Sequence, residues 1–213
     1  MPGYSQSAAV TPLTFENISQ SLLRLVTTLD VGAVHLMGQS IGGMIAQETY
    51  FRFPQSIKSL ILVATTAAFG GKDDSFKNAF LEARLKPLDS GMTMQQVASA
   101  AMPNIVAKNT EPHIIEAAVN SMAPLDPDVY RDVLRCLVTF NRRLEWSQIT
   151  CPVCLVAGSE DTNAPSATMQ KMAAKLSHAR YHEVEGAGHL VNLEKGPEFN
   201  TIVRAFLMTS TRA

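Results

Sequence analysis

A serine set between glycines is the feature of this sequence that points most directly to chemistry. The segment Gly38-Gln39-Ser40-Ile41-Gly42 has the pattern G-x-S-x-G and follows an apolar run, residues 31–37, that has the character of a buried strand. Residues 41–53 are predicted to form a helix that ends before Pro54. A sharp turn between strand and helix strains the serine backbone and raises its hydroxyl above the sheet, and we expect it to leave no room for a side chain at either flanking glycine. The pattern predicts that Ser40 is a nucleophile, with an idle serine in an ordinary turn as the alternative.

A serine hydroxyl becomes a strong nucleophile only when a histidine removes its proton and an acid orients that histidine. Both partners follow Ser40 along the chain. Asp161 comes just after an apolar strand predicted at residues 153–157, and His189 lies in a glycine-rich loop after a strand predicted at residues 180–184. Parallel strands end at the same edge of a sheet, so the three side chains could converge there. Glu160 is the alternative acid, and the offset from the strand favours Asp161.

The elements that would position these residues alternate along most of the chain. This order of strands and helices predicts an α/β fold with a mostly parallel sheet and right-handed crossovers. The predicted helices are residues 14–29, 41–53, 167–176 and 197–207, and the predicted strands are residues 31–37, 60–64, 153–157 and 180–184.

The middle of the chain breaks this alternation, because it contains helical stretches and no convincing strand. We predict that residues 69–147 form a helical cap inserted into a core made of residues 1–68 and 148–213. Methionines and arginines of the cap could line a pocket or bind a substrate carboxylate, although packing and solvated charge are the alternatives. The predicted helical stretches of the cap are residues 82–85, 93–102, 111–122 and 128–140, and the prolines expected to separate them are Pro87, Pro103, Pro112, Pro124 and Pro127. The methionines are Met92, Met94, Met102 and Met122. The arginines are Arg84, Arg142 and Arg143.

Composition excludes several classes of function. The chain has 213 residues, 46% of them hydrophobic, and a formal net charge of −1, which suits one domain with an insertion. Lys and Arg form no cluster, so neither nucleic acid nor a membrane surface is an expected partner. The longest apolar stretch is too short to span a bilayer and the N-terminus does not resemble a signal peptide, so we expect a cytoplasmic protein.

Neither a cofactor nor a metal ion is expected. The sequence has no phosphate-binding loop and no G-x-G-x-x-G after a strand, and His178 and His182 are divided between a loop and a strand instead of sharing a helix. Three cysteines, an odd number, are typical of a reducing compartment. Cys151 and Cys154 have the spacing of a redox pair, but a strand follows the first thiol where such a pair needs a helix, so packing is favoured.

Two segments together resemble a known family. Gly38-Gln39-Ser40-Ile41-Gly42-Gly43-Met44 and Gly188-His189-Leu190-Val191-Asn192-Leu193-Glu194 resemble α/β-hydrolases, and most of all the 3-oxoadipate enol-lactonases and their generalist esterase relatives. The resemblance implies a serine hydrolase that cleaves a small-molecule ester or lactone through an acyl-serine. Ser40, Asp161 and His189 would form the triad, and the Ile41 N–H would stabilise the oxyanion. Carbon-carbon bond hydrolases of aromatic degradation carry related turns and are an alternative.

The resemblance covers about residues 2–207 and implies an N-terminally shortened fold. Residues 2–7 resemble the loop that follows the fourth strand of the family, and nothing corresponds to the elements before it. We therefore expect one oxyanion donor to be missing, which lowers turnover, and the strand at residues 31–37 to lie at an exposed apolar edge where a homodimer could form. The competing hypothesis is a catalytically impaired fragment that acts as a binding or dimerisation module.

Overall fold

The centre of the protein is a parallel sheet. The structure is a computed structural model that describes residues 1–70 and 73–210. Over these residues the sheet has four strands in the order β1-β2-β3-β4, and each neighbouring pair is parallel. This arrangement confirms the predicted α/β fold. The strands are β1 (Val34–Gln39), β2 (Ile57–Val63), β3 (Val153–Gly158) and β4 (Ala179–Val184).

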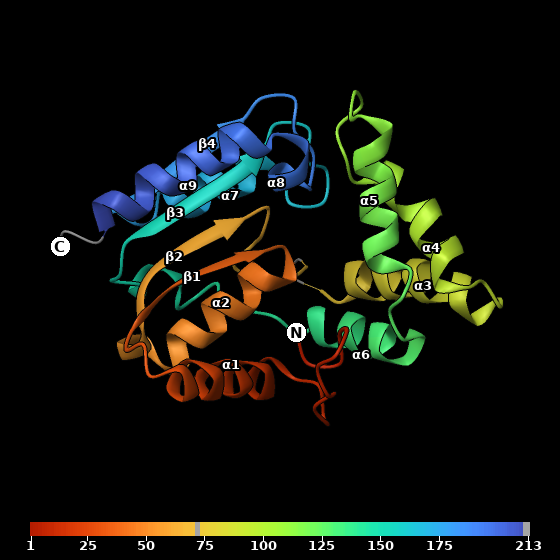
Figure 1. Ribbon diagram of the computed structural model, residues 1–213, viewed down its shortest axis with the longest axis horizontal. Coiled ribbons are helices and arrows are strands. Elements are labelled where there is room, and N and C mark those ends of the chain that lie inside the picture. Colours follow the sequence, from red (N-terminus) through yellow and green to blue (C-terminus); the bar gives the residue numbers. More distant parts are fainter. Residues whose placement is uncertain (71–72, 211–213) are drawn as a thin grey trace.

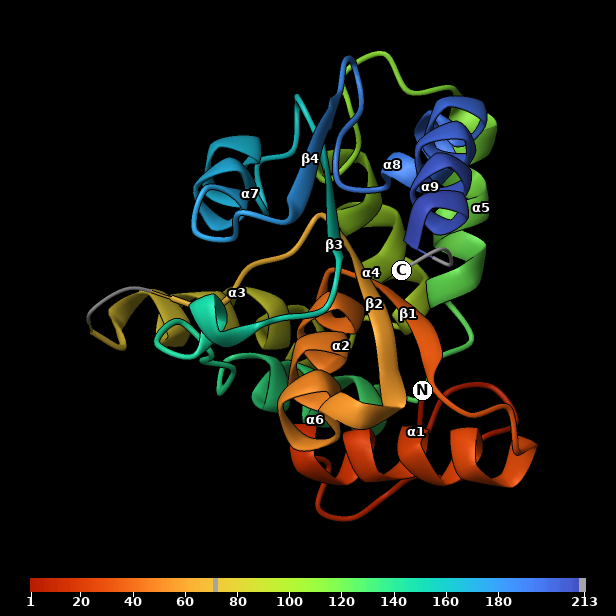
Figure 2. The same ribbon diagram turned by 90° about the vertical axis from the view of Figure 1, so that its left-hand side faces the viewer.

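Helices cover both faces of this sheet (Figure 2). On one face, Leu60 and Leu155 pack with Tyr50 of α2 and Met169 of α7. On the other face, the alternate residues of β2 and β3 pack against Phe199 and Phe206 of α9. Each fully buried Leu or Phe stabilises the fold by about 1.5–3 kcal/mol relative to an exposed one, so these two clusters hold the strand ends in place. The helices around the sheet are α1 (Phe15–Leu29), which packs on α2 (Ile41–Arg52), followed by α7 (Ser166–Ala173), α8 (Val191–Glu194) and α9 (Gly196–Ser210).

All four strands differ in their bounds from the sequence prediction, β3 and β4 by one residue each. β1 begins at Val34 and not at residue 31, because Gly32 has a φ of 68° that interrupts the extended backbone. β2 begins earlier than residue 60, since Ile57 pairs with Val34, and it ends before Ala64, whose φ of 45° turns the chain away. The predicted strands therefore exist, but turns with positive φ decide where they begin and end.

Four helices between β2 and β3 gather at one side of the sheet (Figure 1). Their apolar side chains form a cluster of their own, with Leu88, Met94 and Tyr130 buried at its centre. Met92 and Met122 also pack against this cluster, so these methionines fill the interior of the helical segment. The isolated bridge between Ala68 and Asn141 joins the two ends of the segment, while its boundaries at 68/69 and 147/148 stay a prediction. The helices are α3 (Ser75–Asp89), α4 (Met94–Ala101), α5 (Pro112–Met122) and α6 (Pro127–Leu137).

The prolines of this segment have two different roles. Pro112 and Pro127 are the first residues of α5 and α6, where the missing N–H has no helical partner to lose. Pro87 was expected to separate helices, and that expectation is wrong because it lies inside α3. Its ring removes one N–H from the last turns of α3, which ends two residues later, at Asp89.

The sheet leaves one apolar side chain of an edge strand open to solvent. Among the described residues β1 pairs on one side only, with β2, and Met37 of β1 is 52% exposed. Nearby on the chain, Leu29 and Val31 are also exposed. Self-association through this edge stays a prediction. Across residues 1–70 and 73–210, no helix has both the length and the apolar character needed to cross a bilayer.

Candidate active site

Ser40 occupies a strained turn between β1 and α2. Its φ of 53° and ψ of −120° lie outside the ordinary regions for a residue with a side chain, a conformation that costs about 1–3 kcal/mol. Three hydrogen bonds hold the turn: the Ser40 N–H donates to Val63 O at 2.9 Å, while the Thr65 hydroxyl and the Gly43 N–H donate to Ser40 O at 2.7 and 3.0 Å. The Ser40 hydroxyl itself has no hydrogen-bond partner among the described residues. The predicted turn is therefore present, with its hydroxyl unengaged.

The glycines around Ser40 only partly match the expectation. A side chain at Gly38 would place its Cβ 2.0 Å from Gly42 O, so glycine is required there. The expectation for Gly42 is wrong, because a Cβ at this position meets no described atom within 4 Å. The crowded position is Gly43, whose Cβ would lie 2.7 Å from the Thr65 side chain. The first turn of α2 thus presents Gly43, and not Gly42, to the loop after β2.

Asp161 lies in the loop after β3 with its carboxylate fully engaged. Its Oδ1 accepts hydrogen bonds from the backbone N–H of Asn163 and Ala164, at 2.8 and 3.0 Å. Its Oδ2 lies 2.8 Å from His189 Nδ1. Burial alone would raise the pKa of Asp161, but the hydrogen bond to His189 and those from Ala164 and Asn163 outweigh it, so the pKa is lowered. Asp161 is therefore ionised at neutral pH, and His189 Nδ1 carries the proton that lies between them.

His189 reaches this position only because its loop crosses the end of the sheet. β4 and β1 lie at opposite edges of the described strands, three spacings or about 14 Å apart, yet Gln39 Nε2 at the end of β1 donates to His189 O at 2.6 Å. The loop passes directly over the end of β3, where a Cβ at Gly158 would lie 2.2 Å from Gly188 O. Glycine at Gly158 therefore makes room for the crossing that brings His189 beside the Ser40 turn.

The resulting arrangement has a defined chemical capacity. With its Nδ1–H donating a hydrogen bond to Asp161, a neutral His189 keeps a lone pair on Nε2 that can accept a proton. His189 is 9% exposed and Asp161 is 5% exposed, so both groups are shielded from bulk water. A histidine held in this tautomer next to a strained serine can act as a general base.

Other candidate residues of the sequence have different partners. Glu160, the alternative acid, accepts a hydrogen bond from Lys108 N at 2.9 Å and not from His189. The Arg142 guanidinium donates two hydrogen bonds to the Glu48 carboxylate of α2, both at 2.8 Å. The Arg143 side chain donates to Gly70 O.

The thiols show no sign of redox chemistry. Burial raises the pKa of Cys151 and of Cys154 to about 12, so both stay protonated at neutral pH. In the part of the chain that the structure describes, no three His, Cys, Asp or Glu side chains come close enough together to hold a metal ion.

Sequence reasoning missed two residues of this region. Gln39, whose side chain donates to the backbone of the histidine loop, lies inside the G-x-S-x-G segment. Its position directly before Ser40 was the only feature of the sequence that could have indicated a role at the site. Glu194 accepts hydrogen bonds from the residues on either side of His189. Its only sequence signal is its position five residues after that histidine.

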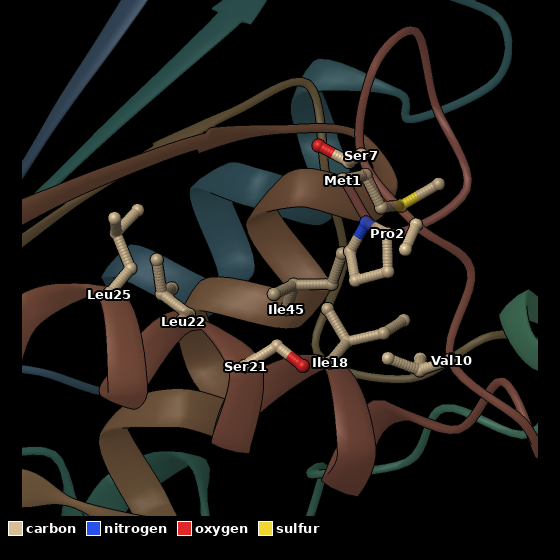
Figure 3. A pocket seen from close by; sticks show the side chains of 10 residues that line it. Met1, Pro2, Ser7, Val10, Ile18, Ser21, Leu22, Leu25 and Ile45 are labelled. Carbon is tan, nitrogen blue, oxygen red and sulfur yellow. The ribbon is translucent and has the colours of Figure 1, made fainter.

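A cavity of about 370 Å³ lies away from these residues (Figure 3). It is formed by the N-terminal segment together with α1 and the side chain of Ile45 on α2. Ser40, Asp161 and His189 are not among the residues that line it. Its lining is mainly apolar, with Val10, Ile18, Leu22 and Leu25 among the contributors.

The family of the protein is identified by sequence comparison. Residues 1–201 match the alpha/beta hydrolase family over most of the chain. The chain belongs to this family. Its parallel sheet with surrounding helices is therefore that of an α/β-hydrolase.

Relatives of this α/β-hydrolase carry the names of enzymes. It is 29% identical over 221 residues to polyketide synthase ThaQ of Burkholderia thailandensis, a match that covers 100% of this chain but only 10% of that protein. It is 24% identical over 204 residues to 3-oxoadipate enol-lactonase 2 of Acinetobacter baylyi, covering 95% of this chain and 74% of the lactonase. The crystal structure of the enol-lactonase from Burkholderia xenovorans LB400 aligns with a TM-score of 0.86 at 24% identity, covering 97% of this chain and 78% of that one. The chain is thus similar in sequence to one enol-lactonase and in fold to another.

Proposed function

We propose that the protein is a serine hydrolase that cleaves a carboxylic ester or lactone through an acyl-serine intermediate. The observation that carries this proposal is the convergence of the Ser40 turn with the hydrogen-bonded pair Asp161 and His189 at one end of the sheet. Strain at Ser40, burial of the pair and the fixed tautomer of His189 all serve nucleophilic catalysis.

In the first half of the reaction, Ser40 Oγ attacks the substrate carbonyl carbon while His189 Nε2 accepts the hydroxyl proton. The carbonyl π electrons move to oxygen and form a tetrahedral oxyanion. When this intermediate collapses, the bond to the leaving oxygen breaks and His189 returns the proton to that oxygen. The products of this half are an acyl-serine and an alcohol, which stays attached to the acyl chain if the substrate is a lactone.

In the second half, a water molecule attacks the acyl carbonyl and His189 takes its proton. Collapse of the second oxyanion releases the carboxylic acid, and the proton returns to Ser40. Asp161 remains ionised throughout and stabilises the imidazolium that forms twice in each cycle. No metal or organic cofactor takes part in this sequence of steps.

The oxyanion donor in this proposal is the Ile41 N–H. Ile41 is the first residue of α2, so its N–H points out of the helix and has no acceptor within the helix. The N-terminal end of a helix also carries a partial positive charge, which favours a developing oxyanion. A single donor of this kind typically contributes a factor of about 10² to 10³ in turnover.

The substrate class rests on the relatives. Two of the proteins similar to this chain are enol-lactonases, and the family as a whole supports hydrolysis. A lactone and an open-chain ester present the same carbonyl carbon to Ser40, so both belong to the proposal. The retained acid, base and nucleophile favour an active enzyme over a binding module.

The test is covalent labelling with a fluorophosphonate, read as the intact mass of the chain. We expect a single phosphonyl adduct on the native protein, and none on Ser40→Ala or His189→Ala. A folded native protein that gains no adduct would overturn the proposal and favour the impaired-fragment hypothesis. A labelled protein that cleaves a carbon-carbon substrate but neither esters nor lactones would reassign the reaction.

A further inference from the structure

Glu194, the last residue of α8, gathers four hydrogen-bond donors from two parts of the chain. Its Oε2 accepts from Gly188 N at 3.0 Å, and its Oε1 accepts from Leu190 N at 2.9 Å. The same Oε2 accepts from Ala107 N at 2.7 Å and from the Thr110 hydroxyl at 2.8 Å. One carboxylate therefore binds both neighbours of His189 and a segment about 85 residues earlier.

This carboxylate has no cationic partner. Over residues 1–70 and 73–210, no lysine, arginine or histidine lies within salt-bridge distance of Glu194. The charge is balanced by N–H and O–H donors alone, and hydrogen bonds to an ionised acceptor are about twice as strong as neutral ones. A half-buried carboxylate with this set of partners is placed to hold backbone in position.

The two segments that Glu194 joins also touch each other directly. His189 N donates to Ile105 O at 2.7 Å. The backbones pack so closely that a Cβ at Gly188 would lie 2.4 Å from Ala107 N. Residues 105–110 follow α4 and precede α5, so the helical segment between β2 and β3 rests on the histidine loop at this point.

We propose that Glu194 is a positioning residue: it fixes the backbone on both sides of His189 and couples that loop to residues 105–110 of the helical segment. This inference rests on the proposed function, in which His189 is the general base. Glu194 touches no reacting atom. It acts by keeping His189 in line between Asp161 and Ser40, so that movement of residues 105–110 is transmitted to the base.

The alternative is that Glu194 only stabilises α8, and this role would explain only one of its four hydrogen bonds. Its bond to Leu190 N, four residues earlier, is the kind that secures the start of a short helix such as α8. The bonds to Gly188, Ala107 and Thr110 lie outside α8 and contribute nothing to that helix. Three of the four donors are therefore explained by positioning and not by stabilisation of α8.

The experiment compares Glu194→Ala, Glu194→Gln and Thr110→Val with the native protein and with Glu198→Gln, an exposed control on α9. Fluorophosphonate labelling is followed to completion, so that the rate constant and the final fraction labelled are measured separately. A misplaced base lowers the rate and leaves the final fraction at one adduct per chain, whereas partial unfolding lowers the final fraction. Hydrogen exchange of peptides covering residues 105–110 and 187–190 is measured on the same samples.

We expect Glu194→Ala to label about 10²-fold more slowly, to the same final fraction, because small displacements of a catalytic group cost about this much. Glu194→Gln keeps one carbonyl acceptor for the three donors at Oε2, so its loss should be about tenfold or less. Thr110→Val removes one of the two bonds from the helical segment, so exchange should speed up in residues 105–110. Labelling should also slow, though less than in Glu194→Ala, because the bond from Ala107 N remains. Glu198→Gln should match the native protein in every measurement.

Labelling of Glu194→Ala at the native rate, or faster exchange confined to α8, would overturn the inference. If Glu194→Ala does not fold, the graded pair Glu194→Gln and Thr110→Val decides the question by the same two measurements. If the native protein itself fails to label, the proposed function fails, and exchange alone tests the coupling. Unchanged protection of both segments in Glu194→Ala would then refute it.

Discussion

Replacing Asp161 by asparagine should disable the base while leaving the fold nearly unchanged. Oδ1 of Asp161 faces two backbone N–H donors, from Asn163 and Ala164, at 2.8 and 3.0 Å. An asparagine can satisfy these donors only with its carbonyl oxygen, so its NH₂ must point at His189 Nδ1. Nδ1 then has to accept, and the imidazole proton moves to Nε2, the atom that must take the proton of Ser40.

The size of the effect follows from this tautomer change. A base that is protonated on the wrong nitrogen in an otherwise intact triad lowers turnover by about 10⁴, which corresponds to about 5 kcal/mol of transition-state stabilisation. We would measure turnover of p-nitrophenyl acetate and the rate of fluorophosphonate labelling, with Asp132→Asn as a control whose side chain on α6 is 58% exposed. The control should match the native protein. Asp161→Asn retaining more than about one tenth of native turnover would refute the argument, because a correctly oriented amide cannot leave Nε2 free.

Three further predictions concern packing, pH and association. Gly158→Ala should slow labelling by about 10²-fold, because its Cβ would lie 2.2 Å from Gly188 O and push the histidine loop away. Gly42→Ala is the control: its Cβ meets no described atom within 4 Å, so this variant should label like the native protein and be equally or more stable. Equal effects of the two substitutions would contradict the steric account. Burial opposes ionisation of Glu48, yet hydrogen bonds from Arg142 and Arg52 lower its pKa. The ionised Glu48 therefore stabilises the fold at pH values above the ordinary glutamate pKa of about 4.3, and this stabilisation is lost as the pH falls through the lower pKa of the folded state. Urea unfolding at pH 7 should show Glu48→Gln to be less stable by roughly 2–4 kcal/mol with a flatter acid limb, and parallel pH curves for the two proteins would be the contrary result. If copies associate through β1, Met37→Lys, at a side chain 52% exposed, should lower the sedimentation coefficient at high concentration, and an unchanged coefficient would locate any association elsewhere.

Much of this site could be predicted from local pattern alone. The alternation of strands and helices predicted a parallel sheet, and residues that follow parallel strands must lie at one edge of it. Ser40, Asp161 and His189 each follow such a strand, so their convergence was a consequence of order along the chain. The bounds of β1 and β2 were less accurate, because single residues with positive φ, at Gly32 and Ala64, are not visible in an apolar pattern.

Contacts between distant segments could not be predicted in this way. Arg142 was a candidate for a substrate carboxylate, but its partner is Glu48, which is 94 residues away. The role of glycine at Gly158 depends on a loop that passes over β3, and the partners of Glu194 lie as far as 87 residues earlier. No sequence window contains both members of such pairs.

The sequence by itself therefore determined the fold class, because periodicity and turn chemistry act over a few neighbouring positions. It also predicted Ser40, Asp161 and His189 as the residues for nucleophilic chemistry, from residue type and turn pattern. The tertiary structure decided which acid meets His189, which glycines are sterically required, and how the helical segment is attached to the histidine loop. The physical reason is that hydrogen bonds and close packing depend on positions in space. Folding brings groups that are far apart in the sequence to within a few ångströms of each other, and the local sequence around each group does not indicate its partner.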